Sequence, residues 1–523
     1  IALAGAAPFD SGANIRFRNC CVNRTTLYAR PKARSPMSRS CSLMWFRNDL
    51  RTSDNLGLSA AVATGLPVRA LYVLDDADSG PRPPGAAARW KLHGALTALE
   101  ARLADLNIPL ILRRGGGAET VGRVIHELDA RCVFWSRRYE PAAVAIDRSL
   151  KAALAASGVD VKSYPGSLLI EPFALTTGSG GYYKVFTPFC KAAREAAGGH
   201  AAQPLPPPPP APAWTLPPPA SDDLNDWDLL PARPDWAGGL REAWDHGEVA
   251  AQSRLRAFLD DGFAGYAGGR NQLNGRFGSA LSPALRFGEI SPRQLQFAAA
   301  AHAGQAGGAL DSDFECFERE LYWRDFCNHL LFHAPDLAGK NFQSRFDAFP
   351  WRASKADFAA WRRGRTGYPI VDAAMRQLWT TGWMHNRARM ITASFLTKHL
   401  AIDWRQGEAW FWDTLVDADV ASNPANWQWT AGSGADAAPY FRIFNPMTQG
   451  EKFDADGAYV RRWVPELAGL PDRHIHAPWT APAAVLEAAG VTLGVTYPEP
   501  IVDHKAARAR ALAGFAATRD ASD

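Results

Sequence analysis

The sequence lacks the features that mark several common classes of protein. Its seven cysteines have no metal-binding spacing, so we expect no metal site. Their odd, scattered arrangement is typical of reduced thiols in an intracellular protein. No apolar run reaches the ~20 residues that cross a membrane as a helix, so we expect no membrane association. The net charge is only +4, so any binding of nucleic acid must depend on a local basic surface.

The dinucleotide-binding fingerprint is also absent, because no G-x-G-x-x-G pattern follows the first predicted strand. Tryptophan, in contrast, is abundant. The chain has 19 tryptophans, and 12 of them follow residue 320. Two interpretations are open: a large aromatic core, or stacking surfaces for a ring-bearing ligand or for nucleic-acid bases.

Residues 1–36 contain six basic residues and one acid, Asp10. An Arg-rich, acid-poor segment of this kind is typical of an organellar transit peptide. It could equally be foreign to the native protein, because Met37 stands just before the first predicted strand. In either case we predict an extension outside the fold.

Residues 37–168 are predicted to form an α/β domain. Short apolar runs alternate with segments whose apolar residues recur at helical spacing. Repeated βα units of this kind give a Rossmann-like parallel sheet covered on both faces. The predicted strands are 42–46, 67–74, 109–114, 132–136 and 159–164, and the predicted helices are 54–64, 86–106, 118–128 and 142–157.

The composition changes after residue 168. The stretch PLPPPPPAPAWTLPPPASDD (204–223) can be neither a helix nor a central strand, which predicts a Pro-rich linker over residues 169–245. From residue 246 to 505 the apolar spacing is helical, so we predict a second, mainly α-helical domain. Residues 506–523 are predicted to be a short C-terminal tail.

Polar and aromatic residues gather in three parts of the helical domain. Glu320 and Arg324 are four residues apart, as are Asn386 and Met390, so each pair shares one face of its helix. The stretch 415–446 is the densest, with closely spaced acids, amides and tryptophans before a Gly- and Pro-containing segment that predicts a tight loop. Acids suit ribose hydroxyls or ion pairs, amides suit the edge of a heteroaromatic ring, and tryptophans suit stacking.

Basic residues are concentrated between residues 362 and 405, where they outnumber the acids eight to two. A basic rim with interleaved tryptophans is what flipped or single-stranded bases require. A solvated Arg-rich helical surface is the alternative. The eight are Arg362, Arg363, Arg365, Arg376, Arg387, Arg389, Lys398 and Arg405.

These segments resemble those of the DNA photolyase/cryptochrome family over residues 42–505, and most closely a class I cyclobutane pyrimidine dimer photolyase. WFRNDLRTSDN (45–55) is similar to the opening motif of the family. GYPIVDAAMRQLWTTGWMHNRARM (367–390), SNPANWQW (422–429) and DAAPYFRIFNP (436–446) are similar to its cofactor and substrate motifs. The resemblance implies an α/β domain, a linker, and a helical domain that holds FAD, whose reduced form is active.

The resemblance also assigns the cofactor-binding residues. Four of them hold the FAD phosphates, five surround the flavin and the adenosine, with Arg389 as the partner of Asp417, and Asn423 faces flavin N5. In that order they are Tyr266, Ser279, Leu281 and Ser282; Arg324, Trp383, Arg389, Asp417 and Asp419; and Asn423.

The remaining assignments concern electron transfer and DNA. Trp427, Trp404 and Trp351 match three tryptophans that relay an electron to photo-excited flavin. Arg270 and Arg387 match contacts to DNA phosphate. The wall of the lesion pocket is assigned to Glu320, Trp323, Asn386, Arg387, Met390 and Trp429, of which Glu320 and Asn386 are the predicted catalytic residues.

Two departures from the family pattern bear on ligands. Gly278 stands where the family usually has Thr, so one phosphate-binding hydroxyl is missing. Ala142 and Ala143 stand where folate-binding relatives have Asn and Glu, so a folate antenna in that position is in doubt. A folate in another position or a deazaflavin remains open as the antenna chromophore.

The resemblance therefore implies light-driven repair of cyclobutane pyrimidine dimers in UV-damaged double-stranded DNA. We expect a monomer, located in the cytoplasm with the nucleoid if bacterial, or in an organelle if residues 1–36 are a transit peptide.

The leading rival function is that of a cryptochrome-type blue-light photoreceptor. Asn423, where plant cryptochromes have Asp, and the 18 residues after residue 505 both favour repair. Two further functions stay open. One is repair of (6-4) photoproducts or of single-stranded DNA, and the other is electron transfer by a flavin protein that does not act on DNA.

Overall fold

The computed structural model describes residues 41–76, 81–198, 202–213, 219–273, 275–437 and 441–520. The predicted extension over residues 1–36, and Pro439 of the predicted tight loop, lie outside these residues. Within the described residues, no helix combines the length and the apolar composition needed to cross a bilayer.

Five strands form one parallel sheet in the order β3-β2-β1-β4-β5. β1 lies in the middle, where Met44 pairs with Ala70 of β2 on one side and with Phe134 of β4 on the other. The predicted α/β fold and its five strands are therefore confirmed. The strands are β1 (Cys41–Phe46), β2 (Val68–Leu74), β3 (Leu110–Arg114), β4 (Ala130–Ser136) and β5 (Asp160–Tyr164).

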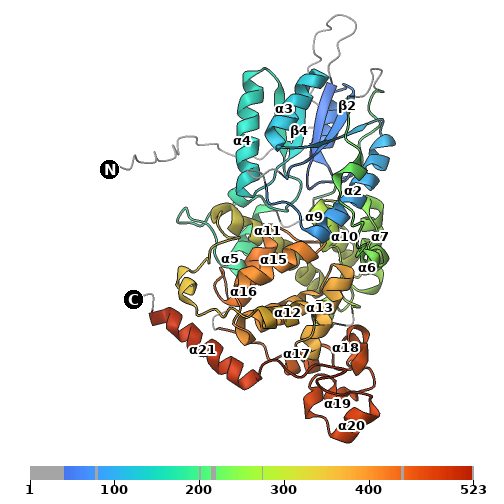
Figure 1. Cartoon of the computed structure of the whole chain (residues 1–523). Helices are drawn as coiled ribbons and strands as arrows, with labels where there is room; N and C mark the ends of the chain where they lie inside the picture. The colour runs from blue at the N-terminus through green and yellow to red at the C-terminus, as the bar shows by residue number, and fades with distance from the viewer. Residues whose placement is uncertain are drawn as a thin grey trace, which may run out of the picture. The chain divides into compact units, whose positions relative to one another are not determined.

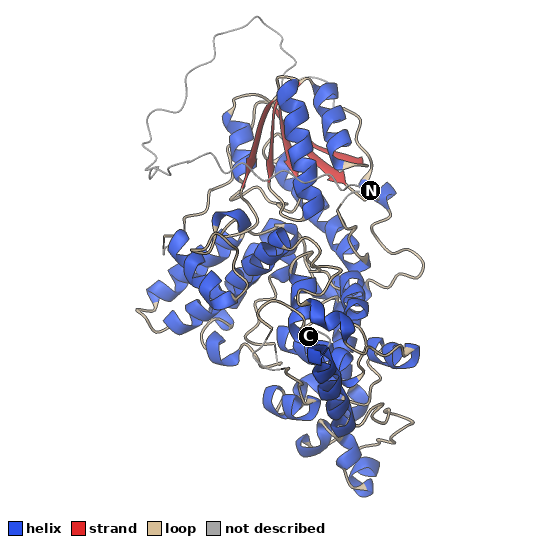
Figure 2. Ribbon diagram, turned by 90° about the vertical axis from the view of Figure 1, so that its left-hand side faces the viewer, coloured by secondary structure: helices blue, strands red, loops and turns tan. Residues whose placement is uncertain are grey.

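Helices cover both faces of this sheet (Figure 2). Alternate residues of a strand point to opposite faces, so Met44 and Phe46 join one apolar cluster while Leu43 and Trp45 join the other. The first cluster is closed by α1 and α2, and the second by α3 and α4. Their bounds are α1 (Leu56–Ala63), α2 (Ala86–Ala104), α3 (Gly117–Leu128) and α4 (Pro141–Ala156).

The predicted linker contains more regular structure than a polyproline spacer. Residues 202–213 form neither helix nor strand, but Trp227 is 2 % exposed and joins the core of the sheet. Phe189 packs on Phe326 of the helical domain, with ring centroids 5.2 Å apart. The linker thus completes the cores of both domains. Its elements are η1 (Pro172–Ala174), α5 (Phe186–Ala196), η2 (Leu224–Trp227) and α6 (Gly238–Ala243).

The second domain is mainly helical, as predicted (Figure 1). Its longest helix is α11. α14, which carries Asn386 and Met390, is followed by a single π-turn, η4, in which the Leu400 N–H donates to the Phe395 carbonyl. The helices are α7 (Gly247–Asp261), α8 (Tyr266–Gly269), α9 (Ser282–Phe287), α10 (Pro292–Gln305), α11 (Asp311–His333), α12 (Lys355–Arg362), α13 (Pro369–Thr381), α14 (Asn386–Ser394), α15 (Trp404–Thr414), α16 (Ser422–Ala431), α17 (Pro446–Phe453), α18 (Ala458–Trp463), α19 (Asp472–Ile475), α20 (Ala483–Ala488) and α21 (His504–Asp520), with single turns η3 (Ser344–Ala348), η4 (Phe395–His399), η5 (Pro465–Leu467) and η6 (Pro478–Thr480).

The segment predicted as a C-terminal tail forms most of α21. This helix packs against η3 and η4, and Phe515 stacks on Phe441 with ring centroids 4.4 Å apart. Its first residue, His504, contacts His399 of η4. The helix is thus part of the domain, with its buried side at Ala507 and Ala511.

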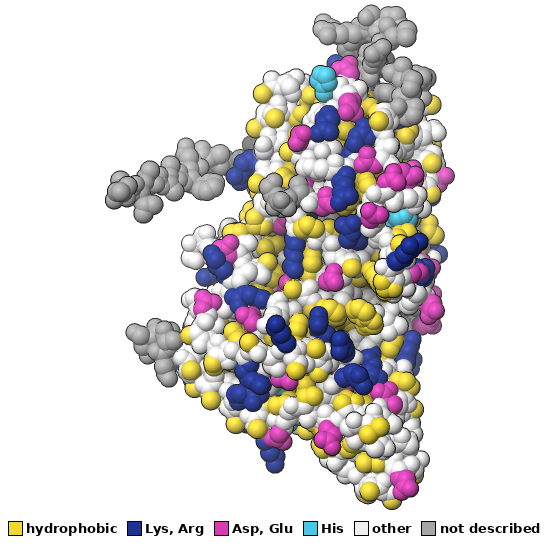
Figure 3. Space-filling model, in the orientation of Figure 1, with side chains coloured by type: hydrophobic (Ala, Val, Ile, Leu, Met, Phe, Trp, Pro, Cys, Tyr) yellow, Lys and Arg dark blue, Asp and Glu magenta, His cyan; other side chains and the backbone are white. Residues whose placement is uncertain are grey.

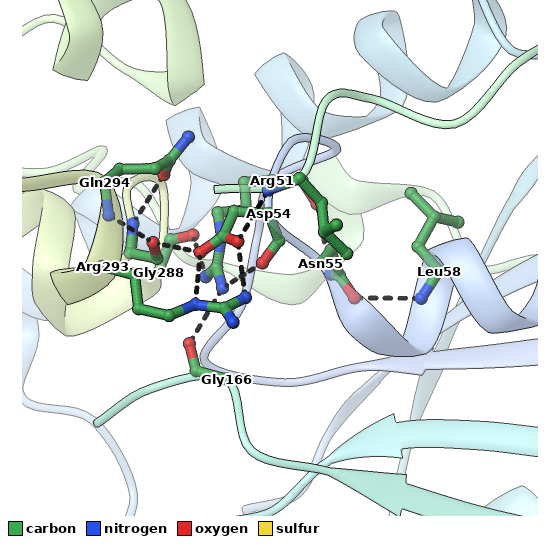
Figure 4. A network of polar contacts seen from close by, with 10 residues as sticks. Arg51, Asp54, Asn55, Leu58, Gly166, Gly288, Arg293 and Gln294 are labelled. Carbon is green, nitrogen blue, oxygen red and sulfur yellow. Dashed lines mark hydrogen bonds and ion pairs between the residues drawn. The ribbon is translucent and has the colours of Figure 1, made fainter. Parts of the chain in front are cut away.

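The opening motif, residues 45–55, lies at the junction of the two domains (Figure 4). Buried Arg51 donates to the carbonyls of Gly288 and Gly166 at 3.0 and 2.8 Å. Asp54 accepts from Arg293 and from the Ser291 hydroxyl at the start of α10. Because these groups are buried, their hydrogen bonds fix how the sheet meets the helical domain.

Candidate active site

The helical domain contains a cavity of about 580 Å³ in which most of the predicted site residues meet. Such a volume lies in the range of cofactor and ligand sites. Only Trp351 and Trp404 of the predicted residues do not line it. The lining includes Tyr266, Arg270, Ser279, Leu281, Ser282, Glu320, Trp323, Arg324, Trp383, Asn386, Arg387, Arg389, Met390, Asp417, Asp419, Asn423, Trp427 and Trp429.

One wall of the cavity is a face of α11. Glu320, Arg324 and Cys327 follow one another at helical spacing and all line the cavity. Arg324 also donates to the carbonyl of Ser167, which ties this wall to the first residues after the sheet. The spacing noted in the sequence therefore corresponds to a real surface.

The predicted pair of Asp417 and Arg389 is present. The guanidinium of Arg389 donates to Asp417 Oδ2 at 2.7 Å, and the carboxylate is 2 % exposed. Asp417 Oδ1 is buried and has no hydrogen-bond partner among the described residues. A buried carboxylate oxygen without a partner is costly, so this atom is suited to accept a donor from a bound ligand.

The neighbouring acid, Asp419, is held as a carboxylate. Burial raises its pKa, but the charges of Arg324 and Arg286 and the N–H of Ser422 outweigh burial and bring the pKa below its usual value. Its side chain also accepts the Ala421 N–H, at the beginning of α16. A negative charge at a helix N-terminus is stabilised by the helix dipole.

α14 begins at the residues assigned to the lesion. His385 caps this helix by accepting the Arg387 N–H on Nδ1 at 3.1 Å. Burial, followed by the charges of Arg387 and Arg389, lowers the pKa of His385 to about 4. The imidazole is therefore neutral near pH 7 and serves as a hydrogen-bonding cap of α14.

Two partners of the predicted residues were not foreseen. Arg387 donates to Asn271 Oδ1 at 2.7 Å, and Arg270 forms an ion pair with Glu320 at 2.5 Å. The second contact joins a residue assigned to DNA phosphate to one assigned to the lesion. These two charges neutralise each other at the cavity wall.

The two tryptophans assigned to the lesion pack against different side chains. Trp323 lies flat on Phe186 from the predicted linker, with centroids 3.7 Å apart and rings 7° from parallel. One face of its indole is therefore covered by the protein. Trp429 has the guanidinium of Arg442 over its ring at 6.0 Å. Nothing in the sequence around Trp323 pointed to Phe186, because 137 residues separate the two.

Asn423 is tied to a residue that sequence analysis missed. Its amide nitrogen donates to Glu408 Oε1 at 2.8 Å and to the Glu408 carbonyl at 3.1 Å. Glu408 lies on α15 and Asn423 on α16, which pack together. A contact between two helices leaves no periodic signal in either segment.

The three relay tryptophans occupy different depths. Trp427 is 3 % exposed and Trp404 is fully buried, while Trp351 is partly exposed and packs on Phe349. Trp427 has ring contacts with Trp361 and Phe411. Trp351 is therefore the most exposed of the three, and their function as a relay stays a prediction.

The expected basic rim over residues 362–405 is not formed as one surface. Arg376 pairs with Glu466 and Arg405 with Asp403, while Lys398 is buried and donates to the Ala431 carbonyl. Only Arg387 and Arg389 of the eight line the cavity. The local density of basic residues overestimated the rim because it does not tell which charges have partners inside the protein. Figure 3 shows basic side chains scattered over one face of the helical domain, between hydrophobic and other side chains.

The cavity residues fit a flavin dinucleotide. Hydroxyls of Ser279 and Ser282 and the guanidinium of Arg324 are donors suited to phosphates, and the free oxygen of Asp417 is an acceptor. The Ser282 hydroxyl already accepts the indole N–H of Trp383 at 3.1 Å, so it is held in place. Among the described residues, His, Cys, Asp and Glu side chains form no group that could hold a metal ion.

Comparison with known proteins places these observations in a family. Residues 42–213 match the family model for DNA photolyase, and residues 317–517 match that for the FAD-binding domain of DNA photolyase. The deoxyribodipyrimidine photo-lyase of Agrobacterium fabrum is 51% identical over 480 residues, covering 91% of this chain and 98% of that protein. Cryptochrome-1 of Arabidopsis thaliana is 36% identical, covering 90% of this chain and 70% of that protein.

A solved structure corrects the predicted class. The crystal structure of a bacterial class III photolyase from Agrobacterium tumefaciens has a TM-score of 0.88 and 49% sequence identity, and the match covers 94% of this chain and all of that one. The likeness to class I that we expected is therefore not supported. The fold, the cavity and these matches together place the chain in the DNA photolyase/cryptochrome family, with an FAD-binding helical domain.

Proposed function

We propose that this chain is a light-driven DNA repair enzyme, a deoxyribodipyrimidine photo-lyase of the class III type, that acts as a monomer on cyclobutane pyrimidine dimers in double-stranded DNA. One observation carries the proposal: the residues assigned to the cofactor and those assigned to the lesion line a single cavity. The two ligands would therefore lie in contact. Direct electron transfer requires such proximity, and a signalling protein does not need a second ligand there.

The residues define how the two ligands would be held. When bound in its reduced state, FAD would supply the electron that opens the dimer under near-UV or blue light, with no net change in its oxidation state. The lesion has to leave the DNA stack, which costs less for a distorted base pair. Trp323 offers its uncovered face to the extruded bases, and Glu320, as a carboxylic acid, would donate its O–H to a base carbonyl on which negative charge develops.

The ion pair of Arg270 and Glu320 connects DNA binding to this step. A DNA phosphate that engages Arg270 would compete with Glu320 for the same guanidinium. Glu320 would then become available to the lesion when DNA is bound.

The lesion specificity follows from the proton donors that the pocket offers. Opening a (6-4) photoproduct requires proton transfer, and neither Asn386 nor Met390 can donate a proton near neutral pH. His385 has a pKa of about 4 and already uses Nδ1 to cap α14. We therefore expect repair of the cyclobutane dimer without (6-4) activity.

The test is illumination of two defined double-stranded oligonucleotides, one with each lesion, by protein whose FAD has been reduced chemically. We expect restoration of the cyclobutane dimer and no change in the (6-4) product. Failure on the cyclobutane dimer, or restoration of the (6-4) product, would overturn the proposal. A cryptochrome-type photoreceptor would bind FAD and restore neither substrate.

A further inference from the structure

The orientation of the Asn423 amide is determined by Glu408. Both hydrogen bonds from Asn423 Nδ2 go to acceptors of Glu408, one in the side chain and one in the backbone. A reversed amide would place Oδ1 against the same two acceptors, which is unfavourable for buried groups. Asn423 lines the cavity, so its Oδ1 is the atom left for the ligand.

Glu408 is in turn held by a residue of the α/β domain. Arg82, 326 residues away in the sequence, donates from Nη1 and Nη2 to the two carboxylate oxygens at 2.6 and 3.1 Å. The Glu408 side chain is 5 % exposed and that of Arg82 is 35 % exposed. The guanidinium also lies over the ring of Trp412, one turn further along α15, at 4.1 Å. It is therefore fixed between a carboxylate and an indole.

The segment around Arg82 is attached to α15 independently of that guanidinium. The Pro83 carbonyl accepts the indole N–H of Trp412 at 2.9 Å, and the Ala86 N–H donates to Asp413 at 3.0 Å. A Cβ on Gly85 would lie 2.1 Å from the Trp412 carbonyl oxygen, so only glycine permits this approach. Removal of the Arg82 side chain should thus leave the two domains docked.

We propose that Arg82 is a positioning residue for the flavin site: it keeps Glu408 a pure acceptor, and Glu408 then keeps the carbonyl oxygen of Asn423 directed at the cofactor. The inference rests on the proposed function for the identity of the ligand at Asn423. Without the guanidinium, neither oxygen of the Glu408 carboxylate would be held by Arg82, and the side chain could turn away from Asn423. The Asn423 amide would then be free to reverse.

The chemistry at the cavity side depends on this orientation. Reduced flavin carries an N–H at N5, and oxidised flavin has a lone pair there. A carbonyl oxygen that faces N5 accepts from the reduced form and has no donor in the oxidised form. Arg82 would therefore strengthen the binding of reduced FAD relative to oxidised FAD, although Arg82 itself does not line the cavity.

The experiment measures the dissociation constants of oxidised and reduced FAD for the intact chain and for Arg82→Leu, without DNA or light. One net hydrogen bond of ~1 kcal/mol corresponds to about fivefold in affinity. We expect the preference for reduced FAD to fall by about that factor in Arg82→Leu. Arg82→Lys, which keeps the charge, should restore most of it.

The matched control is Arg89→Leu. Arg89 lies on α2, in the same part of the chain, and donates to the Trp227 and Asp228 carbonyls instead of Glu408. The Arg89→Leu variant should leave the preference for reduced FAD over oxidised FAD unchanged. An unaltered preference in Arg82→Leu, or an equal loss in Arg89→Leu, would overturn the proposal.

A double-mutant cycle tests whether Arg82 acts through Glu408. In Glu408→Gln the side chain carries no charge for Arg82 to hold, so adding Arg82→Leu should change the preference no further. Additive effects would contradict the chain of contacts. Because only FAD binding is measured, this outcome is independent of whether the wild-type chain repairs a dimer.

Discussion

At the scale of single residues, the predicted photoreduction of FAD depends on the indole of Trp427. Trp427 is buried against Phe411 at 4.9 Å and lines the cavity. Replacing it by Phe removes the indole, which is far easier to oxidise than a phenyl ring, and retains most of the packing. We predict that Trp427→Phe abolishes photoreduction of oxidised FAD while FAD stays bound, as followed by absorption spectroscopy under blue light.

The same variant separates two electron transfers. Dimer repair with chemically reduced FAD should largely survive in Trp427→Phe, because the relay is needed only to reduce the cofactor. The control is Trp90→Phe, because Trp90 is a buried tryptophan of α2 that does not line the cavity. FAD in this variant should be photoreduced normally. Undiminished photoreduction in Trp427→Phe would remove Trp427 from the relay.

Arg387 allows a second test with a single residue. It is held by Asn271 and lines the cavity, where the family resemblance assigns it to a DNA phosphate. Each phosphate neutralised by a protein cation releases counterions, so we predict that Arg387→Ala lowers the slope of log affinity against log salt by about one. The measurement is a salt titration with dimer-containing DNA.

The control for that prediction is Arg362→Ala. Arg362 belongs to the same basic stretch but lies over Trp410 and Phe358, away from the cavity. Loss of Arg362 should change the slope of log affinity against log salt by less than loss of Arg387 does. An unchanged slope in Arg387→Ala would mean that this residue does not contact the DNA backbone.

The sequence predicted many site residues and few of the contacts that hold them. The pairing of Asp417 with Arg389 was foreseen and is present. Glu408 and Arg82 were not, because a contact between residues 326 positions apart has no local pattern. A motif predicts which type of residue stands at a position, whereas the orientation of that side chain depends on neighbours outside the motif.

At the scale of helices, α15 and α16 approach closely at a glycine. A Cβ on Gly407 would lie 2.2 Å from the Trp427 ring, which is buried and cannot yield easily. We predict that Gly407→Ala destabilises the protein by ~1–3 kcal/mol, as overpacking of a core does, and slows photoreduction by displacing Trp427. Chemical denaturation and flavin spectroscopy measure the two effects.

Gly122→Ala is the matched control for this prediction. Gly122 lies within α3, and a Cβ there meets nothing within 4 Å. Alanine is the better helix former by ~1 kcal/mol, so this variant should be slightly more stable than the wild type. A stable Gly407→Ala protein with normal photoreduction would contradict the close packing of α15 on α16.

Elements with a strong period were predicted well, and those within segments of unusual composition were not. The five strands and the long helices were found because apolar residues recur in them at regular spacing. α5 was hidden inside the proline-rich linker, and α21 was assigned to a tail although its Ala-rich sequence has a high helix propensity. Composition dominated the interpretation of both segments, whereas their packing on α11 and η4 decides their structure.

Across the whole molecule, buried histidines and acids make stability depend on pH. Burial is the largest cause that lowers the pKa of His246, His329 and His385 to about 4 and of His399 to about 3. Between pH 6.5 and 4 these groups bind protons in the unfolded chain and not in the folded one. Their contribution to stability is therefore lost as the pH falls.

Two buried acids act in the opposite direction. Burial raises the pKa of Asp325 to about 7 and of Asp372 to about 6. These groups hold a proton in the folded state above pH 3.8, so their contribution is lost as the pH rises through these values. Four histidines against two acids leave a net uptake of protons on unfolding.

We therefore predict that the free energy of unfolding falls on acidification from pH 6.5 to 4, at a rate of up to ~3 kcal/mol per pH unit. Chemical denaturation at a series of pH values measures it. Two variants of α11 should move the slope in opposite directions: His329→Gln should flatten it, and Asp325→Asn should steepen it. A slope that neither variant alters would show that these groups do not titrate as described.

The core of the α/β sheet has a consequence for synthesis on the ribosome. Trp227 and Leu229 complete the apolar cluster on the face of the sheet that α1 and α2 cover. Asp54 accepts a hydrogen bond from Arg293, which is also synthesised later. The sheet itself is complete at Tyr164. At ~5–20 residues per second, several seconds pass before the closing residues leave the exit tunnel. During that interval the part of this face that Trp227 and Leu229 cover is open to water, and a chaperone could bind there.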